Sequence, residues 1–344
     1  MTERILLVLP CCIGDVVLAT AALRALRRAR PTAHLTWAVG RWSAGVLHGH
    51  PDLDALLDTG DAALPVRRPI DFIRFRAQVA AGRFDAAVSL VRSPLMAAAL
   101  WAARVPVRVG LNSGGRGLLY TVRRDLDPNT PEHEAEIYLS VLRAWGVDTT
   151  GCAPQVIPSE ADEAAMRQQL AAHGVASRFM VVNPAGGANP GMTLAAKRYP
   201  LDWLAQIVNR LSAAADAQPV LIGGPSDAPL VAELAARLSM PSASLVGALS
   251  LLQLGALARA SWLYLGNDTG LTHLASACGA RAVMFMGPTD PRRYGLYGGS
   301  GLTLWKPAPV SARGVAGAQP AWDWARDGLP PDEAFARIAA FVGL

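Results

Sequence analysis

The sequence predicts an α/β protein built from two doubly wound domains. Short apolar runs rich in β-branched residues alternate with longer helical patterns, and such alternation indicates parallel strands covered by helices on both faces. It occurs in two series, separated by residues 147–159, a stretch rich in glycine, proline and threonine. We therefore expect domains at residues 1–160 and 161–330 that face a central cleft, because ligands of such folds bind at the carboxyl ends of the strands.

Each expected strand is a short continuous apolar run, as in a strand buried on both faces of its sheet. Each expected helix is a longer run with apolar residues at helical spacing. In the first series, strands at 5–9, 35–39 and 86–90 precede helices at 16–29, 42–48 and 95–102. In the second series, strands at 179–182, 220–222 and 262–265 precede helices at 203–211, 230–238 and 271–277, and a strand at 282–285 follows.

The composition is that of a folded protein with a large apolar core. Of 344 residues, 51% are hydrophobic and 17% are charged, which excludes a disordered or collagen-like chain. The four cysteines form no CxxC pair, and the adjacent Cys11 and Cys12 are expected to be buried thiols in a reducing compartment. The apolar run at 93–103 is bounded by arginines and is too short to span a membrane. We expect a cytoplasmic protein that contacts, at most, the inner face of the cytoplasmic membrane.

The positive charge is unevenly distributed. The chain has 32 basic and 27 acidic residues, a net charge of +5, and Lys197 and Lys306 are its only lysines. Residues 62–124 hold 11 arginines against Asp71 and Asp85, a local charge of +9. This segment is either a docking surface for an anionic partner, such as a phosphorylated glycolipid or the membrane that carries it, or a solvated arginine-rich surface. Nucleic acid is not expected, because the segment has few aromatic residues and no binding motif.

A first candidate site follows the first expected strand, where Gly14 and Asp15 begin a helix. Glycine permits close approach of a ligand, and a helix N-terminus favours a carboxylate. Asp15 is therefore either a ligand-facing carboxylate or a helix-capping residue.

A second candidate site is the glycine-rich loop at 183–193, which Lys197 follows. The loop lies between an expected strand and an expected helix, where backbone N–H groups can bind phosphate oxygens. It matches neither the Walker A motif nor GxGxxG, which argues against a dehydrogenase. Lys197 is either a diphosphate-binding ammonium, which suits a leaving group that shifts, or a chance surface lysine.

The most specific candidate is the run at 266–275, in which a polar, glycine-containing turn links a strand to a helix. Backbone N–H groups near Thr269 and Gly270 are expected to point at an anion, with the helix dipole behind them. Asp268 is suited to accept hydrogen bonds from sugar hydroxyls. His273 is either a residue that contacts the bound molecule or a hydrogen-bonded core histidine. The turn at 287–291 is expected to line the same site.

Metal and nucleophile signals are weak. His48 and His50 have no third ligand nearby, and two Asp-Leu-Asp triplets, at 52–54 and 125–127, fit loop or capping carboxylates better. No GxSxG motif and no catalytic triad order is present. We expect no metal and no cofactor.

Together these motifs resemble the glycosyltransferase family 9 heptosyltransferases, over residues 4 to about 300. The segments that carry the resemblance occur in the family's order: Gly14-Asp15-Val16-Val17, the middle stretch 131–147, residues 183–200, Val246-Gly247 before 251–254, residues 266–275 and residues 287–291. The resemblance implies a GT-B fold, which consists of two Rossmann-like domains. It implies that the C-terminal domain holds the nucleotide sugar, and that a final helix at 331–344 packs back on the N-terminal domain.

The resemblance also implies roles for individual residues. Asp15 corresponds to the general base that deprotonates the acceptor hydroxyl, and Lys197 assists departure of the diphosphate. The implied donor-binding set comprises Gly14, Thr193, Lys197, Asp227, Asp268, Thr269, Gly270 and His273. Such a base opposite a cationic leaving-group site fits an inverting, metal-independent transfer of a heptose or related sugar from an ADP-sugar to an anionic glycolipid, such as lipopolysaccharide inner core.

Departures from the family pattern keep alternatives open. No basic residue stands shortly before the Gly14-Asp15 pair, at residues 8–11, where family members usually have one. Residues 305–330 show little resemblance, and Asp227 stands where the family often has a glutamate that binds ribose. The alternatives are a transferase of the same fold that glycosylates a soluble natural product or a protein, and a non-catalytic protein that binds a nucleotide sugar.

Overall fold

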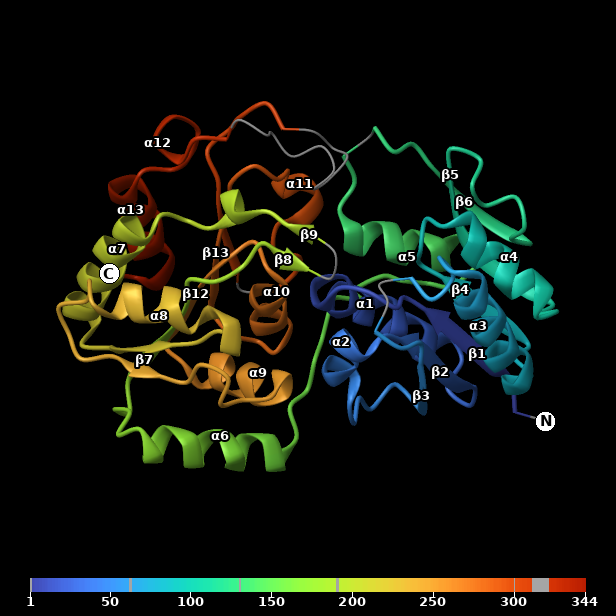
Figure 1. Cartoon of the computed structure of the whole chain (residues 1–344), viewed down its shortest axis with the longest axis horizontal. Coiled ribbons are helices and arrows are strands. Elements are labelled where there is room, and N and C mark those ends of the chain that lie inside the picture. The colour runs from blue at the N-terminus through green and yellow to red at the C-terminus, as the bar shows by residue number, and fades with distance from the viewer. Residues whose placement is uncertain (1, 62–63, 130, 190–191, 300, 311–321) are drawn as a thin grey trace. The chain divides into compact units, whose positions relative to one another are not determined.

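The computed structural model describes residues 2–61, 64–129, 131–189, 192–299, 301–310 and 322–344, without the side chains of residues 188–193. The chain forms two compact units, Met1–Gln155 and Val156–Leu344, called here the N-terminal and C-terminal units (Figure 1). The unit boundary lies a few residues before the expected one at 160. Both units are α/β, as the sequence predicts.

The N-terminal unit is a parallel six-stranded sheet of order β3-β2-β1-β4-β5-β6 with helices between its strands. In chain order its elements are β1 (Arg4–Val8), α1 (Ile13–Ala29), β2 (His34–Val39), α2 (Arg41–Ala44), the 3₁₀ helix η1 (Gly45–Leu47), β3 (Ala55–Asp58), α3 (Pro69–Gly82), β4 (Ala86–Ser89), α4 (Pro94–Ala102), β5 (Val107–Ser113), β6 (Val122–Leu126) and α5 (Glu134–Ala144). The helix expected at 42–48 is thus only α2 followed by η1.

Helices cover both faces of this sheet. Leu6 and Val8 of β1 lie in one core cluster with Phe75 of α3 and Met96 of α4, so α3 and α4 cover the face to which these strand residues point. On the opposite face, α1 packs against α5 (Figure 1).

The sequence did not predict strands β3, β5 and β6. Alternate residues of β3 and of most of β6 are exposed, because these strands form the two edges of the sheet. An edge strand therefore lacks the continuous apolar run by which buried strands are found.

The C-terminal unit has a second parallel sheet, of order β11-β10-β7-β12-β13-β14, and a separate two-stranded antiparallel sheet, β8-β9. Its elements are α6 (Glu160–Ala172), β7 (Phe179–Asn183), β8 (Ala188–Asn189), β9 (Met192–Thr193), the 3₁₀ helix η2 (Ala195–Lys197), α7 (Leu201–Ala215), β10 (Gln218–Leu221), the 3₁₀ helix η3 (Pro225–Asp227), α8 (Ala228–Ala235), β11 (Ala243–Ser244), α9 (Leu251–Ala260), β12 (Leu263–Asn267), α10 (Gly270–Ala277), β13 (Ala282–Phe285), α11 (Pro291–Tyr294), β14 (Gly301–Leu304), α12 (Trp324–Asp327) and α13 (Pro331–Val342).

The C-terminal helix α13 belongs to the C-terminal unit. Its Ala334 and Ile338, one turn apart, lie in the core cluster that contains α7. The Arg210 guanidinium of α7 lies 3.7 Å from the centre of the Phe335 ring and pairs with Asp332 at 2.7 Å. The prediction that this helix packs on the N-terminal domain is therefore wrong, because its apolar stripe is buried against α7.

The strands of both large sheets follow the same order. In each sheet the chain first adds strands on one side of the first strand and then crosses to add the rest on its other side, so the direction of winding reverses at one point. That point lies between β1 and β4 in the N-terminal unit and between β7 and β12 in the C-terminal unit. Loops that leave the carboxyl ends of these strands diverge, and ligands of doubly wound sheets bind there. Among the described residues, no helix is both long and apolar enough to cross a membrane.

Candidate functional site

In the C-terminal unit, three separate loops meet at the winding reversal around the carboxylate of Asp268. This residue directly follows β12 and is buried. Its Oδ2 lies 2.6 Å from Nζ of Lys197, at the end of η2, and accepts a 2.6 Å hydrogen bond from Oγ1 of Thr289. The structure thus brings together Lys197, Asp268 and the 287–291 turn, as the sequence predicts. Lys197 is also buried, so it is not a chance surface lysine.

Neighbouring groups favour the ionised form of the Asp268 carboxylate at this site. Burial by itself raises the pKa of Asp268, but the Lys197 ammonium, the Thr289 hydroxyl and the nearby His273 together lower that pKa below its usual value. Lys197 also lies 6.0 Å from the centre of the Tyr294 ring. A buried pair of this kind contributes little net stability, so its presence at a ligand-binding edge favours a functional role.

Helix α10 begins directly beside this pair. Its first residue is Gly270, and Thr269 is the N-cap residue, although the Thr269 side chain accepts no capping hydrogen bond. The first backbone N–H groups of a helix have no acceptor within the helix and carry the positive end of its dipole. His273 is buried one turn further along. The start of α10 therefore lies next to Lys197, and anion binding by Thr269 and Gly270 stays a prediction.

Asn267 is a site residue that the sequence did not reveal. Its Nδ2 donates to the carbonyl oxygens of Pro184 at 2.9 Å and Ala185 at 3.0 Å, and its Oδ1 accepts from the backbone N–H of Tyr199 at 2.9 Å. One buried amide therefore fastens the glycine-rich loop and the segment after Lys197 to the end of β12. The only available signal was a polar residue at the end of an apolar strand.

Gly186 explains why the loop after β7 is rich in glycine. It has φ of +141°, and a Cβ added there would lie 2.3 Å from Cγ2 of Thr269. The loop can approach the start of α10 this closely only without a side chain.

Two predicted donor residues have no contact with this cluster in the part of the chain that the structure describes. The side chain of Thr193 lies outside the described residues, although its backbone pairs with Ala188. Asp227 is half-buried beyond the carboxyl end of β10, where its Oδ2 accepts from the backbone N–H of Gly224 at 2.9 Å. It shares the edge of the sheet with Asp268, but no contact between these two residues is found in the described part of the chain.

In the N-terminal unit, Asp15 lies in the first turn of α1, with Gly14 directly before it. The N-cap residue is Cys12, and it makes no side-chain capping bond. Oδ1 of Asp15 instead accepts a 2.9 Å hydrogen bond from the hydroxyl of Tyr138 on α5. Burial, followed by the charges of Asp15 and Glu134, raises the pKa of Tyr138 well above its usual value. Tyr138 is therefore a permanent donor that orients the Asp15 carboxylate.

The start of α5 carries a second ion pair beside Tyr138. Glu134 is almost fully buried and accepts from Nη2 of Arg92 through both carboxylate oxygens, at 2.8 and 3.0 Å. Arg92 lies in the loop after β4, so the pair sits at the same winding reversal as Asp15. Sequence reasoning did not single out Tyr138, Arg92 or Glu134, although two of them fall in the family-like stretch 131–147.

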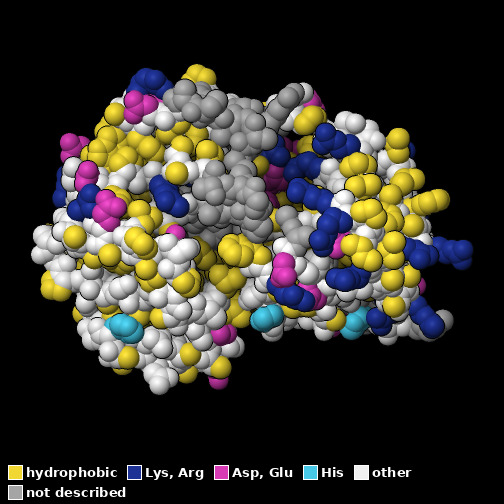
Figure 2. Space-filling model, viewed as in Figure 1, with side chains coloured by type: hydrophobic (Ala, Val, Ile, Leu, Met, Phe, Trp, Pro, Cys, Tyr) yellow, Lys and Arg dark blue, Asp and Glu magenta, His cyan; other side chains and the backbone are white. Residues whose placement is uncertain are grey.

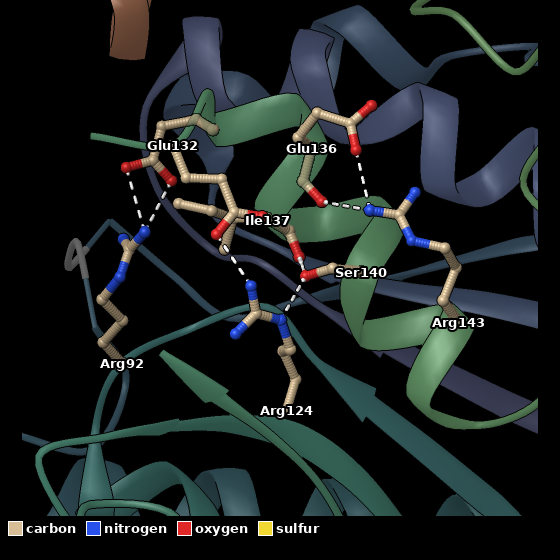
Figure 3. A network of polar contacts seen from close by, with 8 residues as sticks. Arg92, Arg124, Glu132, Glu136, Ile137, Ser140 and Arg143 are labelled. Atoms are coloured by element: carbon tan, nitrogen blue, oxygen red, sulfur yellow. Dashed lines mark hydrogen bonds and ion pairs between the residues drawn. The ribbon is translucent and has the colours of Figure 1, made fainter. Parts of the chain in front are cut away.

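Figure 3 shows that one further arginine links α5 to the sheet and that another pairs within the helix. Arg124 of β6 pairs with Glu132 at 2.8 Å and donates through Nε to Oγ of Ser140 at 3.1 Å. Arg143 pairs with Glu136 at 2.7 Å on the next part of the helix. These contacts fix the helix that positions Tyr138.

The adjacent cysteines differ from the prediction. Both Cys11 and Cys12 are partly exposed rather than buried, because they lie in the loop between β1 and α1. Their sulfur atoms are 2.7 Å apart, and the hydrogen bond from the Cys12 thiol lowers the pKa of Cys11. The pKa of Cys12 is raised by the same hydrogen bond and by burial.

His50, one of the weak metal candidates, has a structural role. Both ring nitrogens of His50 are engaged, Nε2 with the carbonyl oxygen of Gln155 at 3.1 Å and Nδ1 with the backbone N–H of Asp52 at 3.2 Å. Within the described residues, no group of three or more histidine, cysteine, aspartate or glutamate side chains is arranged to hold a metal ion.

Two Rossmann-like units, each with polar side chains at its winding reversal, form the GT-B architecture, which structurally similar glycosyltransferases share. The chain belongs to glycosyltransferase family 9 (heptosyltransferase), whose family model matches residues 72–313. It is therefore a glycosyltransferase.

Individual relatives agree with this assignment. Lipopolysaccharide heptosyltransferase 3 of Escherichia coli is 23% identical over 287 residues, which are 80% of this chain and 81% of that protein. A family 9 glycosyltransferase from Veillonella parvula has a similar structure, with a TM-score of 0.77 and 23% identity over 88% of this chain and 85% of the other. ADP-heptose lps heptosyltransferase II of E. coli gives a TM-score of 0.77 and 21% identity over 99% and 98% of the two chains. E. coli heptosyltransferase WaaC with ADP gives a TM-score of 0.69 and 18% identity over 98% of this chain and 100% of the other.

Proposed function

We propose that this chain transfers a heptose, or a related sugar, from an ADP-sugar to a hydroxyl of an anionic glycolipid such as lipopolysaccharide inner core. The family membership supports sugar transfer, and the names of the relatives support the choice of ADP-heptose and lipopolysaccharide. The observation that carries the proposal is the buried Lys197–Asp268 pair beside the start of α10. This arrangement suits a ligand that has both a diphosphate and sugar hydroxyls.

On the donor side, Lys197 and the first N–H groups of α10 bind the diphosphate. An ammonium has three N–H donors, so Lys197 can keep one on Asp268 and direct the others to phosphate oxygens. Asp268, which stays ionised, accepts hydrogen bonds from hydroxyls of the sugar. Asp227 and Thr193 are proposed as further donor contacts, to the ribose and the diphosphate respectively.

On the acceptor side, Asp15 is the general base. The acceptor oxygen forms a bond to the anomeric carbon while the bond between that carbon and the diphosphate oxygen breaks, and Asp15 takes the hydroxyl proton. The negative charge that grows on the departing diphosphate is stabilised by Lys197 and by the dipole of α10. A single displacement of this kind inverts the configuration at the anomeric carbon, and this scheme assigns no step to a metal ion.

The test is a transfer assay with ADP-heptose and an inner-core acceptor, with the product identified by mass spectrometry and its anomeric configuration by NMR. We expect one added heptose, inversion, and equal rates with and without EDTA. A thermal-shift panel of ADP, UDP, GDP and CDP should show stabilisation by ADP above the others, since a ligand that binds only the folded state raises its stability. Preference for another nucleotide would overturn the choice of donor. Transfer to soluble acceptors alone would favour the alternative, a transferase of the same fold that glycosylates a soluble natural product or a protein.

A further inference from the structure

Helix α4 is apolar around its whole circumference, yet one side of it is uncovered. From Pro94 to Ala103 the sequence contains no polar side chain, and helices of that kind are normally buried on all sides. Met96 and Leu100 point into the core, but the side chains of Leu95 and Trp101 are 48% and 58% exposed.

The neighbouring helix α3 repeats this pattern. Phe75 and Val79 point into the core, while Ile70 and Ile73, one turn apart, are 57% and 58% exposed. The two helices pack side by side, and a 3.2 Å hydrogen bond from Nε of Arg76 to the carbonyl oxygen of Ala102 links them. Their exposed apolar residues therefore belong to one surface.

The connection between β5 and β6 adds to the same surface. Leu118 is 71% exposed and Leu119 is 37% exposed. The next residue, Tyr120, is buried in the core cluster that α3 and α4 share, so the connection lies on the same side of the sheet. We call these six side chains the apolar face: Ile70, Ile73, Leu95, Trp101, Leu118 and Leu119. They are six of the ten large apolar side chains that are exposed among the described residues.

Arginines border the apolar face, and the acidic residues of this segment are already engaged. Arg74, Arg104 and Arg116 are exposed and form no ion pair with any residue that the structure describes. Asp71 pairs with Arg68 at 2.6 Å, and Asp85 accepts from the backbone N–H of Arg4 at 2.8 Å. Figure 2 shows hydrophobic and basic side chains intermixed over the N-terminal unit.

We propose that the apolar face and its arginines dock on an anionic lipid bilayer, with the apolar side chains inserted at the level of the headgroups. Exposed apolar patches of this kind mark interaction sites, and a bilayer with anionic lipids offers both an apolar interior and negative charge. A second copy of the chain would place arginines opposite arginines, which is unfavourable. The inference deepens the proposed function and rests on it for its setting, because a glycolipid acceptor resides in a bilayer.

The test compares vesicle binding by matched variants of the full chain. Wild-type protein should co-sediment with vesicles of phosphatidylethanolamine and phosphatidylglycerol, and should bind phosphatidylcholine vesicles much more weakly. The double variant Ile73→Ser/Trp101→Ser should lose roughly tenfold or more in partitioning, because it removes inserted apolar area. Trp42→Ser is the matched control, since Trp42 is 53% exposed on α2 and lies outside the apolar face. It should bind as the wild type does.

Electrostatic and apolar contributions can be separated. Arg74→Ser/Arg104→Ser should weaken binding to anionic vesicles, and added salt should remove most of the difference between this variant and the wild type. Thermal unfolding of every variant establishes that it is folded, and the exposed positions make that the expected result.

Several outcomes would overturn the inference. One is equal vesicle binding by Ile73→Ser/Trp101→Ser and the wild type, and another is equal binding of wild type to neutral and anionic vesicles. A third is wild-type self-association in sedimentation velocity that the double variant abolishes, because the face would then be a contact between copies. Transfer to a water-soluble acceptor fragment separates the two proposals. Vesicle binding without transfer contradicts only the proposed function, and transfer without vesicle binding contradicts only the docking face.

Discussion

Nζ of Lys197 lies 2.6 Å from Oδ2 of Asp268, and both side chains are buried at the start of α10. The two residues are 71 positions apart in the sequence, and the fold joins them at the winding reversal of the C-terminal sheet. The pair therefore places a fixed positive charge and a fixed carboxylate at the point where a doubly wound sheet binds its ligand.

Replacement of Lys197 tests the donor side. We expect Lys197→Ala to lower kcat/KM for the ADP-sugar by about 10²-fold or more, because the charge on the diphosphate grows in the transition state. ADP affinity, measured by calorimetry, should fall as well. Lys197→Arg keeps the charge but presents a planar fork, so it should recover only part of the activity. Unchanged kinetics in Lys197→Ala would contradict a diphosphate contact.

Replacement of Asp15 tests the base. Asp15→Ala should reduce kcat by roughly 10²–10⁴-fold, the usual contribution of a general base, with little change in ADP affinity. Single-turnover measurements with saturating donor distinguish the chemical step from product release. A variant that keeps its turnover would remove Asp15 from the mechanism.

Tyr138→Phe tests a positioning residue. The substitution removes the 2.9 Å hydrogen bond to Asp15 and little else. We expect a several-fold loss of kcat and a shift of the acid limb of kcat/KM to higher pH, since the carboxylate loses a donor that favours its charged form. In an Asp15→Ala background the same substitution should have almost no further effect on kcat. A purely structural tyrosine would instead lower the free energy of unfolding without moving the pH profile.

The Asp268 carboxylate should make the free energy of unfolding depend on pH in the acid range. Its pKa is lower in the folded protein than the ordinary value of 3.8, so its contribution to stability is fully present above that value and is lost as the pH falls through the lower folded pKa. In Asp268→Asn, the free energy of unfolding measured with urea should fall less steeply as the pH is lowered through this range. The substitution should also cost on the order of 3–5 kcal/mol at neutral pH, because Lys197 stays buried without its partner. Asp332→Asn, at a highly exposed position, is the control and should leave the curve unchanged.

The cysteines should differ in reactivity. The Cys12 thiol lowers the pKa of Cys11, which is partly exposed, whereas Cys152 and Cys278 are buried and burial raises the pKa of Cys278 to about 12. We expect iodoacetamide to label Cys11 first in the folded protein, as peptide mapping by mass spectrometry can show. Earlier labelling of Cys278 would contradict this order.

The sequence by itself determined the fold class and the edge at which each site lies. Buried strands such as β1, β7 and β12 are continuous apolar runs. The residues that follow them must emerge at the carboxyl edge of a parallel sheet, as Asp268 does directly after β12 and Asp15 does in the first turn of α1. These features are local, because a strand and the turn that follows it are contiguous in the chain.

Only the tertiary structure decided which side chains meet and which surfaces stay uncovered. Tyr138 lies 123 positions from Asp15, and no spacing rule predicts a contact over such a distance. Helix α13 has an apolar stripe that predicts burial but does not specify the partner, which proved to be α7. The apolar sequence of α4 likewise predicts burial on all sides. Its exposed side depends on which elements the rest of the chain packs against it, and that is settled by long-range packing rather than by local sequence.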